Sequence, residues 1–231
     1  YMTIAGLQSY KKILILGYGR EGQASERFLQ KFVPQAEILI ADQAADPSYL
    51  SKQGEADLVI KTPVIPKHLV AVPYTTGTNL FLANVNRPVI GVTGSKGKST
   101  TTSLIGEILR AAGKNVHVVG NIGHAALEAL CDERVGDEIY VMEMSSYQLD
   151  DAKYSPHIGV FVSFFPEHLD YHGSREAYFE AKSHITTHQT KDDVFYYHPG
   201  YPEIAALATR TRANAIPFRR EMPFSLEGIP L

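Results

Sequence analysis

The sequence has very little cysteine: Cys131 is the only one among 231 residues. A single cysteine excludes an internal disulfide and any zinc site built from several cysteines. It agrees with a reducing compartment, so we expect a cytoplasmic protein. No apolar run approaches the roughly 20 residues of a membrane-spanning helix, so we expect no association with a membrane.

The sequence also lacks a large excess of either basic or acidic residues. The chain has 22 basic and 25 acidic residues and a formal net charge of −3. Because no overall basic field attracts a phosphate backbone, we expect no nucleic-acid partner. No internal repeat is found, and the length allows one large domain or two ordinary ones.

What the sequence does contain is a glycine-rich turn between a predicted strand at 89–93 and a predicted helix with apolar residues at 104–109. Backbone N–H groups of such a turn, together with the N-terminus of the helix, attract phosphate. Lys98 is placed to reach the outer phosphates of a nucleotide, and the Ser99 hydroxyl to ligate magnesium. The predicted ATP-binding residues are Gly94, Ser95, Lys96, Gly97, Lys98, Ser99 and Thr100.

The turn is shorter than the most common phosphate-binding loop, which would require glycine where Val92 stands. The alternative is a tight turn that binds nothing. Three threonines, Thr100–Thr102, occupy the start of the predicted helix. Threonine is a poor helix former, so a bound nucleotide explains this composition better.

A second nucleotide pattern lies near the N-terminus. A predicted strand at 12–16 leads into the turn Gly17–Gly22, which has the spacing Gly-x-Gly-x-x-Gly. A helix pattern and a second strand at 37–41 follow, and Asp42 comes directly after that strand. This order is the dinucleotide-binding fingerprint and predicts a site for a nucleotide diphosphate. A turn without a ligand is the alternative.

Strands and helices alternate along the chain, which predicts an α/β protein with mostly parallel sheets. We expect a Rossmann-like domain over residues 1–87 and a P-loop-type ATPase domain over residues 88–231. Further strands are predicted at 58–60, 115–119, 138–143, 157–163 and 193–197. Ligands of such sheets bind beyond the carboxyl ends of the strands. The residues predicted to converge there are Lys98, Asn121, Glu143 and His168.

Three of the side chains near these strand ends carry possible chemistry. Glu143 ends a strand beside the phosphate loop, where magnesium needs a carboxylate; a surface acid is the alternative. His168 is a metal ligand, zinc included, or part of a polar turn. Lys182 lies within a helix predicted at 174–187, and spacing alone indicates a surface lysine whose stem covers apolar neighbours.

In order and spacing, these motifs resemble those of the Mur ligases, and more specifically of the members that add D-glutamate. The segments that carry the resemblance are 92–102, 120–123, 143–149, 167–170 and 181–182. The resemblance covers essentially the whole chain. It implies an ATP-dependent carbon–nitrogen ligase of peptidoglycan precursor synthesis that acts as a monomer. Its substrates would be UDP-N-acetylmuramoyl-L-alanine and D-glutamate, with ATP and magnesium.

The implied reaction passes through an acyl phosphate on the substrate carboxylate, which the amine of the incoming amino acid then attacks. Lys98 and magnesium would neutralise charge on the transferred phosphoryl group. The resemblance implies that Ser99 and Glu143 hold one magnesium, that His168 helps to hold a second, and that Lys182 is carbamylated. The implied catalytic residues are Lys98, His168 and Lys182. The implied substrate-binding residues are Gly19, Arg20, Glu21, Gly22, Asp42, Gln43, Asn121 and Ser146.

The chain departs from the family pattern at single residues and in its domain content. Val64 stands where the family usually has glycine, and Glu167 replaces the usual aspartate before His168. The family also has a third domain that binds the incoming amino acid, for which we find no counterpart in these 231 residues. We therefore expect the chain alone to bind ATP weakly and not to complete ligation.

Three alternatives remain at this point. The first is another Mur-like ligase that uses a different amino acid or a folate-type substrate. The second is a nicotinamide-dependent dehydrogenase, although the second phosphate loop would then have no role. The third is a nucleotide-binding module without catalytic activity.

Overall fold

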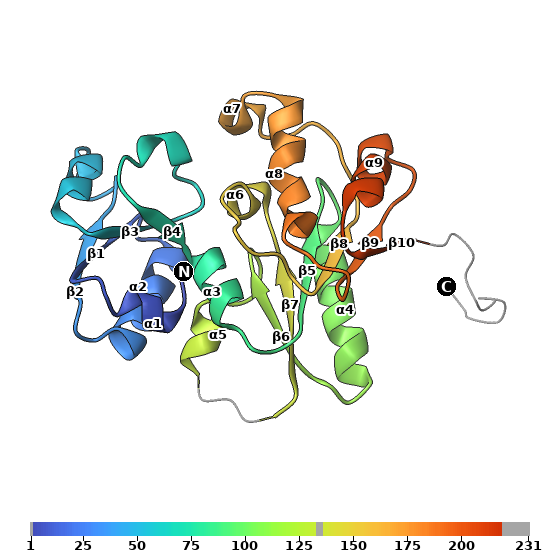
Figure 1. Cartoon of the computed structure of the whole chain (residues 1–231), viewed down its shortest axis with the longest axis horizontal. Coiled ribbons are helices and arrows are strands. Elements are labelled where there is room, and N and C mark those ends of the chain that lie inside the picture. Colours follow the sequence, from blue (N-terminus) through green and yellow to red (C-terminus); the bar gives the residue numbers. More distant parts are fainter. Residues whose placement is uncertain (1, 133–135, 219–231) are drawn as a thin grey trace.

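The computed structural model describes residues 2–132 and 136–218, which form two parallel β-sheets with helices packed against them (Figure 1). The strand order is β2-β1-β3-β4 in the first sheet and β10-β9-β8-β5-β7-β6 in the second. All paired strands run parallel. The predicted α/β class with mostly parallel sheets is therefore confirmed.

The first lobe, which runs from blue to blue-green in Figure 1, contains the elements up to residue 84. Its strands are β1 (Lys12–Leu16), β2 (Glu37–Ala41), β3 (Leu58–Lys61) and β4 (Tyr74–Thr76). Its helices are α1 (Ile4–Leu7), α2 (Arg20–Phe32) and α3 (Gly77–Asn84), with the 3-10 turns η1 (Tyr49–Glu55) and η2 (Lys67–Leu69).

The second lobe runs from green to red in Figure 1. Its strands are β5 (Val89–Thr93), β6 (Asn115–Gly120), β7 (Glu138–Glu143), β8 (Ile158–Phe161), β9 (Val194–Tyr197) and β10 (Asn214–Pro217). Its helices are α4 (Lys98–Ala111), α5 (Glu128–Cys131), α6 (Ser146–Leu149), α7 (Leu169–His172), α8 (Arg175–Thr187) and α9 (Pro202–Arg210). Among the helices in the described ranges, none has the length and apolarity needed to cross a bilayer.

Successive side chains of a strand point to opposite faces of the sheet, and in both sheets each face carries buried apolar side chains. In β7, Met142 joins one buried cluster with Phe161, whereas its neighbour Val141 joins another with Val92. In β1, Ile15 and Leu14 are divided between two clusters in the same way. Buried parallel strands of this kind appear in the sequence as continuous apolar runs, which is why the sequence predicted them well.

One apolar cluster is shared by the two lobes. It includes Ile15 and Phe28 of the first lobe together with Leu127, Met142 and other residues of the second. Helix α2 packs against α5 across this junction. The two lobes are therefore held in a fixed relation by this shared core and by the contact of α2 with α5.

The bounds of β1, β2 and β7 agree with the sequence predictions, and Ser174 caps α8 by accepting a hydrogen bond from the Ala177 N–H. The strand predicted at 157–163 is shorter, because β8 ends at Phe161 and residues beyond it turn toward the phosphate loop. The proposed domain division at residue 87 remains a prediction; β5 of the second sheet begins at Val89.

Candidate active site

The turn between β5 and α4 requires glycine at two positions. Gly94 and Gly97 have φ angles of +155° and +84°, in the region that L side chains rarely adopt. A Cβ on Gly94 would also lie 2.6 Å from Cγ2 of Val162. The turn therefore brings its backbone close to the segment that follows β8.

Backbone and hydroxyl hydrogen bonds fasten this loop to the segment after β8. The Ser95 N–H donates to the Ser163 carbonyl at 2.9 Å, and the Lys96 N–H donates to Ser163 Oγ at 2.9 Å. The Phe165 N–H donates to Ser95 Oγ at 2.8 Å. These bonds hold the loop rigidly at the end of the central strand β5.

Two lysine ammonium groups are directed at the loop. Lys182 of α8 is only 1% exposed, and its Nζ donates to the Gly94 carbonyl at 2.8 Å. Lys98 Nζ donates to the Ser95 carbonyl at 2.9 Å. Burial, and secondarily the charge of Lys98, lowers the pKa of Lys182 to about 7. Burial also lowers the pKa of Lys98, against the opposing influence of Glu143.

Glu143, the last residue of β7, is almost fully buried beside these lysines. Its Oε1 accepts a hydrogen bond of 2.7 Å from the Asn121 side-chain amide. Its Oε2 is buried and has no hydrogen-bond partner among the described residues. A buried carboxylate oxygen without a partner is costly, and a divalent cation would satisfy it.

His168 adopts a backbone conformation that is unusual for a non-glycine residue. Its φ is +54°, and no other non-glycine residue in the described ranges has a positive φ. Its ring lies 5.1 Å from that of Tyr147 and 6.1 Å from that of Tyr178, measured between centroids. The Tyr178 hydroxyl is 3.2 Å from Ser95 Oγ, so His168 lies close to the phosphate loop. Strained residues of this kind concentrate at functional sites.

A metal site formed from protein acids, histidines and cysteines alone is not found: no group of three or more such side chains suited to a metal lies within 2–132 and 136–218. This finding gives no support to the zinc alternative. Magnesium, by contrast, takes only one or two carboxylates and completes its shell with hydroxyl, water and phosphate oxygens. Glu143 and the exposed Ser99 hydroxyl provide donors of that type.

A cavity of about 610 Å³ lies between the two lobes, beside the first glycine turn. Six of the predicted substrate-binding residues line it: Gly19, Arg20, Glu21, Asp42, Gln43 and Asn121. The other lining residues are Gly17, Tyr18, Ala44, Tyr49, Thr62, Pro63, Val64, Ile65, Ser145, Tyr147 and Gln148. Its volume is within the range of small-molecule sites.

Asp42 shapes the first-lobe wall of this cavity. Its carboxylate accepts hydrogen bonds from the Tyr18 N–H at 2.5 Å and from the Ala44 N–H at 2.8 Å. These two bonds lower the pKa of Asp42, so it remains ionised at neutral pH. The carboxylate thus holds the glycine turn next to the end of β2.

Arg20 joins the two lobes at the floor of the cavity. Its guanidinium donates to the carbonyls of Gly120, Asn121 and Gly123 at 2.8, 3.0 and 3.1 Å. Its donors therefore point to the turn after β6, whose Asn121 side chain in turn holds Glu143. The family resemblance implied only a substrate-binding role for this residue.

Two predicted substrate-binding residues do not line the cavity. A Cβ on Gly22 would lie 2.2 Å from the Gly17 carbonyl, so Gly22 permits α2 to pack closely on the turn. Ser146 is buried, and its Oγ lies 3.0 Å from Nε2 of His172. Burial lowers the pKa of His172.

The sequence interpretation missed the immediate neighbours of Ser146. Ser145, Tyr147 and Gln148 line the cavity, and Gln148 donates to Glu21 across the lobes at 3.2 Å. Burial raises the pKa of Glu21. The available signal was the capping box of Ser145 and Gln148, which predicts a helix start at the carboxyl end of β7.

Comparison with known proteins fits this geometry. The sequence model of the Mur ligase middle domain matches residues 92–221. The chain belongs to the Mur ligase family. UDP-N-acetylmuramoylalanine--D-glutamate ligase from Symbiobacterium thermophilum is 40% identical over 76% of this chain and 40% of that protein. The protein of the same name from Streptococcus pyogenes serotype M49 is 34% identical over 90% of this chain and 52% of that protein.

Solved structures of Mur ligases share the fold. A UDP-N-acetylmuramate:L-alanyl-gamma-D-glutamyl-meso-diaminopimelate ligase from Neisseria meningitides has a TM-score of 0.58 at 16% identity, over 90% of this chain and 78% of that chain. The MurF ligase of Thermotoga maritima, solved with ADP, has a TM-score of 0.52 at 18% identity, over 94% of this chain and 52% of that chain. The chain spans about half or less of the length of the two curated relatives.

Proposed function

We propose that this chain supplies the ATP site and the UDP-substrate site of a ligase that joins D-glutamate to UDP-N-acetylmuramoyl-L-alanine. The observation that carries the proposal is the unpartnered, buried Oε2 of Glu143 beside a glycine loop and two lysines. The names of the curated relatives support the choice of substrates. The lone Cys131 agrees with a cytoplasmic location.

In this proposal, the loop from Gly94 to Thr100 binds the phosphates of ATP through its backbone N–H groups and the N-terminus of α4. The residues that would hold magnesium are Ser99, Glu143, His168 and a carbamylated Lys182. When bound, magnesium would neutralise negative charge on the phosphoryl group during transfer. The unpartnered Glu143 oxygen and the exposed hydroxyl of Ser99 are of the donor type that this ion requires.

The protein groups have a defined task in the proposed reaction. Two anions, the substrate carboxylate and the γ-phosphoryl group, must approach each other, and the Lys98 ammonium offsets their repulsion. The phosphoryl group moves to the carboxylate oxygen and ADP leaves. The amine of D-glutamate then attacks the acyl carbon, and inorganic phosphate is the leaving group. The hydrogen bonds that fix the loop to Ser163 keep its donors oriented throughout.

The UDP-linked substrate would occupy the cavity between the lobes. Gly19, Arg20 and Glu21 would lie along the diphosphate, with Asp42 and Gln43 near the uracil. Asn121 lines this cavity and also donates to Glu143, so one residue borders both proposed sites. This arrangement would bring the far end of the substrate toward the phosphate loop.

Isothermal titration with UDP-N-acetylmuramoyl-L-alanine, compared with UDP-N-acetylmuramoyl-tripeptide, tests the substrate assignment. We expect saturable binding of the first compound and at least about tenfold weaker binding of the second, because a ligand shaped for the site leaves fewer polar groups unpaired. Equal or tighter binding of UDP-N-acetylmuramoyl-tripeptide would indicate that the chain has the substrate of a different Mur ligase. NADH serves as a control, and we expect no change in its fluorescence.

A further inference from the structure

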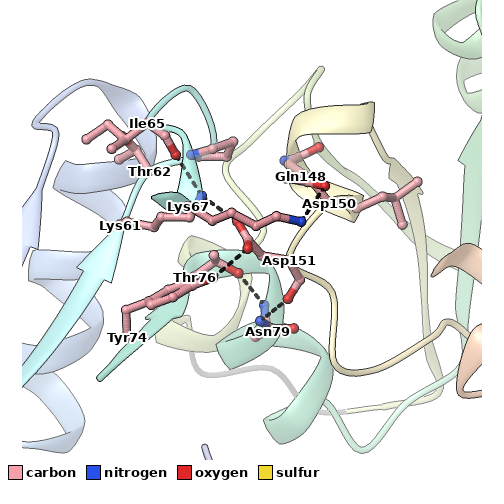
Figure 2. A network of polar contacts seen from close by, with 12 residues as sticks. Lys61, Thr62, Ile65, Lys67, Tyr74, Thr76, Asn79, Gln148, Asp150 and Asp151 are labelled. Atoms are coloured by element: carbon pink, nitrogen blue, oxygen red, sulfur yellow. Dashed lines mark hydrogen bonds and ion pairs between the residues drawn. The ribbon is translucent and has the colours of Figure 1, made fainter. Parts of the chain in front are cut away.

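Opposite walls of the cavity come from different lobes and are joined by a buried ion pair. The loop after β3, residues 62–65, forms one wall, and Ser145, Tyr147 and Gln148 at α6 form the other. Lys61 ends β3, Asp151 follows α6, and Lys61 Nζ lies 2.5 Å from Asp151 Oδ2. Figure 2 shows the two side chains meeting between the lobes. Their side chains are 0% and 3% exposed.

Each member of the pair has further partners that fix its direction (Figure 2). Lys61 Nζ donates to the Ile65 carbonyl at 2.9 Å, within the wall loop itself. Asp151 Oδ1 accepts from the Tyr74 hydroxyl at 2.8 Å, and the Asp151 carbonyl accepts from the Asn79 side-chain amide at 2.8 Å. Burial, and secondarily the hydrogen bond to Asp151 and its negative charge, raise the pKa of Tyr74, so the phenol remains a donor.

Stability alone does not account for this pair. Removing two charges from water costs about as much as their attraction returns, and apolar replacements of similar size are often neutral or stabilising. What an ion pair adds over apolar contacts is direction and distance. Here the fixed distance joins the end of β3 to the end of α6, and each of these ends carries one wall of the cavity.

We propose that Lys61 and Asp151 are positioning residues that set the separation of the cavity walls for the UDP-linked substrate. The inference rests on the proposed function of the cavity. Neither side chain lines the cavity, so any influence on a ligand must pass through the residues that do. The Lys61 bond to the Ile65 carbonyl and the peptide connection from Asp151 to Gln148 are the two routes.

The chain provides a matched control pair. Lys67 lies in the segment after β3 and Asp150 in the segment after α6, and Lys67 Nζ is 2.9 Å from Asp150 Oδ1. The Lys67 side chain, however, is 52% exposed. An exposed ion pair contributes little to rigidity or stability. Loss of this second pair should therefore leave the wall separation unchanged.

The test uses the double variant Lys61→Met with Asp151→Leu, and Lys67→Met as control. We expect the double variant to fold and its Kd for UDP-N-acetylmuramoyl-L-alanine to be about tenfold higher or more. The Kd for Mg-ADP should stay unchanged, and Lys67→Met should alter neither constant. Should the apolar pair prevent folding, Lys61→Gln with Asp151→Asn keeps hydrogen bonds at this position and should weaken binding in the same direction.

A folded double variant with an unchanged Kd for the UDP compound would overturn the inference alone. So would equal weakening of both ligands, because that outcome indicates a general structural role. If the unaltered chain fails to bind the UDP compound, the proposed function itself fails, and this inference fails with it.

Discussion

The buried lysine of α8 has the chemistry that a carbamate needs. Lys182 is 1% exposed, and burial brings its pKa to about 7, so a large share of its amines are neutral at neutral pH. The neutral amine is the nucleophile that reacts with carbon dioxide. Its position beside Gly94 and Glu143 would then put the new carbamate oxygens at the proposed metal site. Spacing in the sequence gave no hint of this burial.

The pH dependence of stability tests the burial of Lys182 directly. Between about pH 7 and pH 10 the unfolded lysine keeps its proton while the folded one loses it, so stability rises with pH in this window. In buffers free of carbon dioxide, we expect the free energy of unfolding of Lys182→Met to lack this rise. The variant should therefore be more stable than the unaltered chain, and the difference should be largest at pH 7. Urea unfolding at pH 7, 8 and 9 measures the difference. Parallel stability curves for the two proteins would contradict it.

Carbamylation itself is a separate prediction. With ¹³C-labelled bicarbonate, we expect one carbamate carbonyl signal in the carbon NMR spectrum, stabilised by magnesium. The signal should be absent in Lys182→Met and retained in Lys153→Met, which alters a lysine outside the loop and cavity. A spectrum that is the same for all three proteins would show that Lys182 is not the modified residue.

The Glu143 carboxylate offers a test of magnesium binding. Glu143→Gln keeps an oxygen to accept the Asn121 hydrogen bond but removes the charge. We expect Mg²⁺-dependent nucleotide binding to weaken roughly tenfold or more, because loss of even a supporting partner has such effects at metal sites. Glu138→Gln, at the other end of β7, is the control and should leave the Mg²⁺ dependence unchanged. Equal Mg²⁺ dependence of nucleotide binding in Glu143→Gln and Glu138→Gln would show that Glu143 is not a magnesium ligand.

At the scale of elements, the turn from β1 to α2 depends on one of its glycines much more than on the other. Gly17 has a φ of +90°, and a Cβ there would lie 2.1 Å from Thr62 Oγ1. Gly19 has a φ of −74°, and a Cβ there would have no neighbour within 4 Å. The same motif therefore contains a glycine needed by the fold and one that leaves room beside the cavity.

We expect Gly17→Ala to lower the free energy of unfolding by about 1–3 kcal/mol, the cost of a strained backbone. Gly19→Ala should change it by less than about 0.5 kcal/mol, as at an open position. Chemical denaturation of both variants measures the two values. A similar loss of unfolding free energy in both variants would contradict the different roles of Gly17 and Gly19 in the turn.

The elements that the sequence predicted well are those with strong local signals. Buried runs such as Ile13–Leu16 and Val89–Val92 are apolar throughout, and the glycines after them mark the turns. Strand β4 has only three residues, Tyr74–Thr76, and α6 only four, so neither has a period that can be recognised. Their existence depends on tertiary contacts, among them the bond from Tyr74 to Asp151.

The same distinction holds for the candidate site. Lys98 and Glu143 could be assigned to one crevice because parallel strands end at the same edge of a sheet. Tyr49 reaches the cavity from a segment that carries no motif, and only the folded chain brings it there. Buried Lys61 and Asp151 were missed for the same reason: each looks like a surface residue until its partner is known.

At the scale of the whole molecule, the two lobes act as one body because they share a core and several polar links. Arg20 binds the turn that carries Asn121, and Asn121 binds Glu143. This chain of contacts leads from the cavity wall to the proposed metal site. We therefore expect the two proposed ligands to influence each other's affinity.

Prior saturation with UDP-N-acetylmuramoyl-L-alanine should lower the Kd for Mg-ADP. The coupling is the ratio of the Kd values for Mg-ADP without and with the first ligand. Arg20→Ala should reduce this ratio by at least about twofold, which is within the range of coupling between linked sites. Titrations with and without the first ligand measure it. Arg27→Ala is a suitable control, since Arg27 is on the same helix and also contacts the second lobe, through Glu128. Coupling that is equal in the two variants would contradict the route through Asn121.

A crystal structure of the chain grown with ADP and Mn²⁺ is the most direct test of the central claim, because the anomalous signal of Mn²⁺ locates the ion. The account predicts phosphate oxygens on the Gly94–Thr100 loop and the ion bound to Ser99 Oγ and Glu143 Oε2. A nucleotide bound elsewhere, or an ion that leaves Glu143 Oε2 without a ligand, would contradict it.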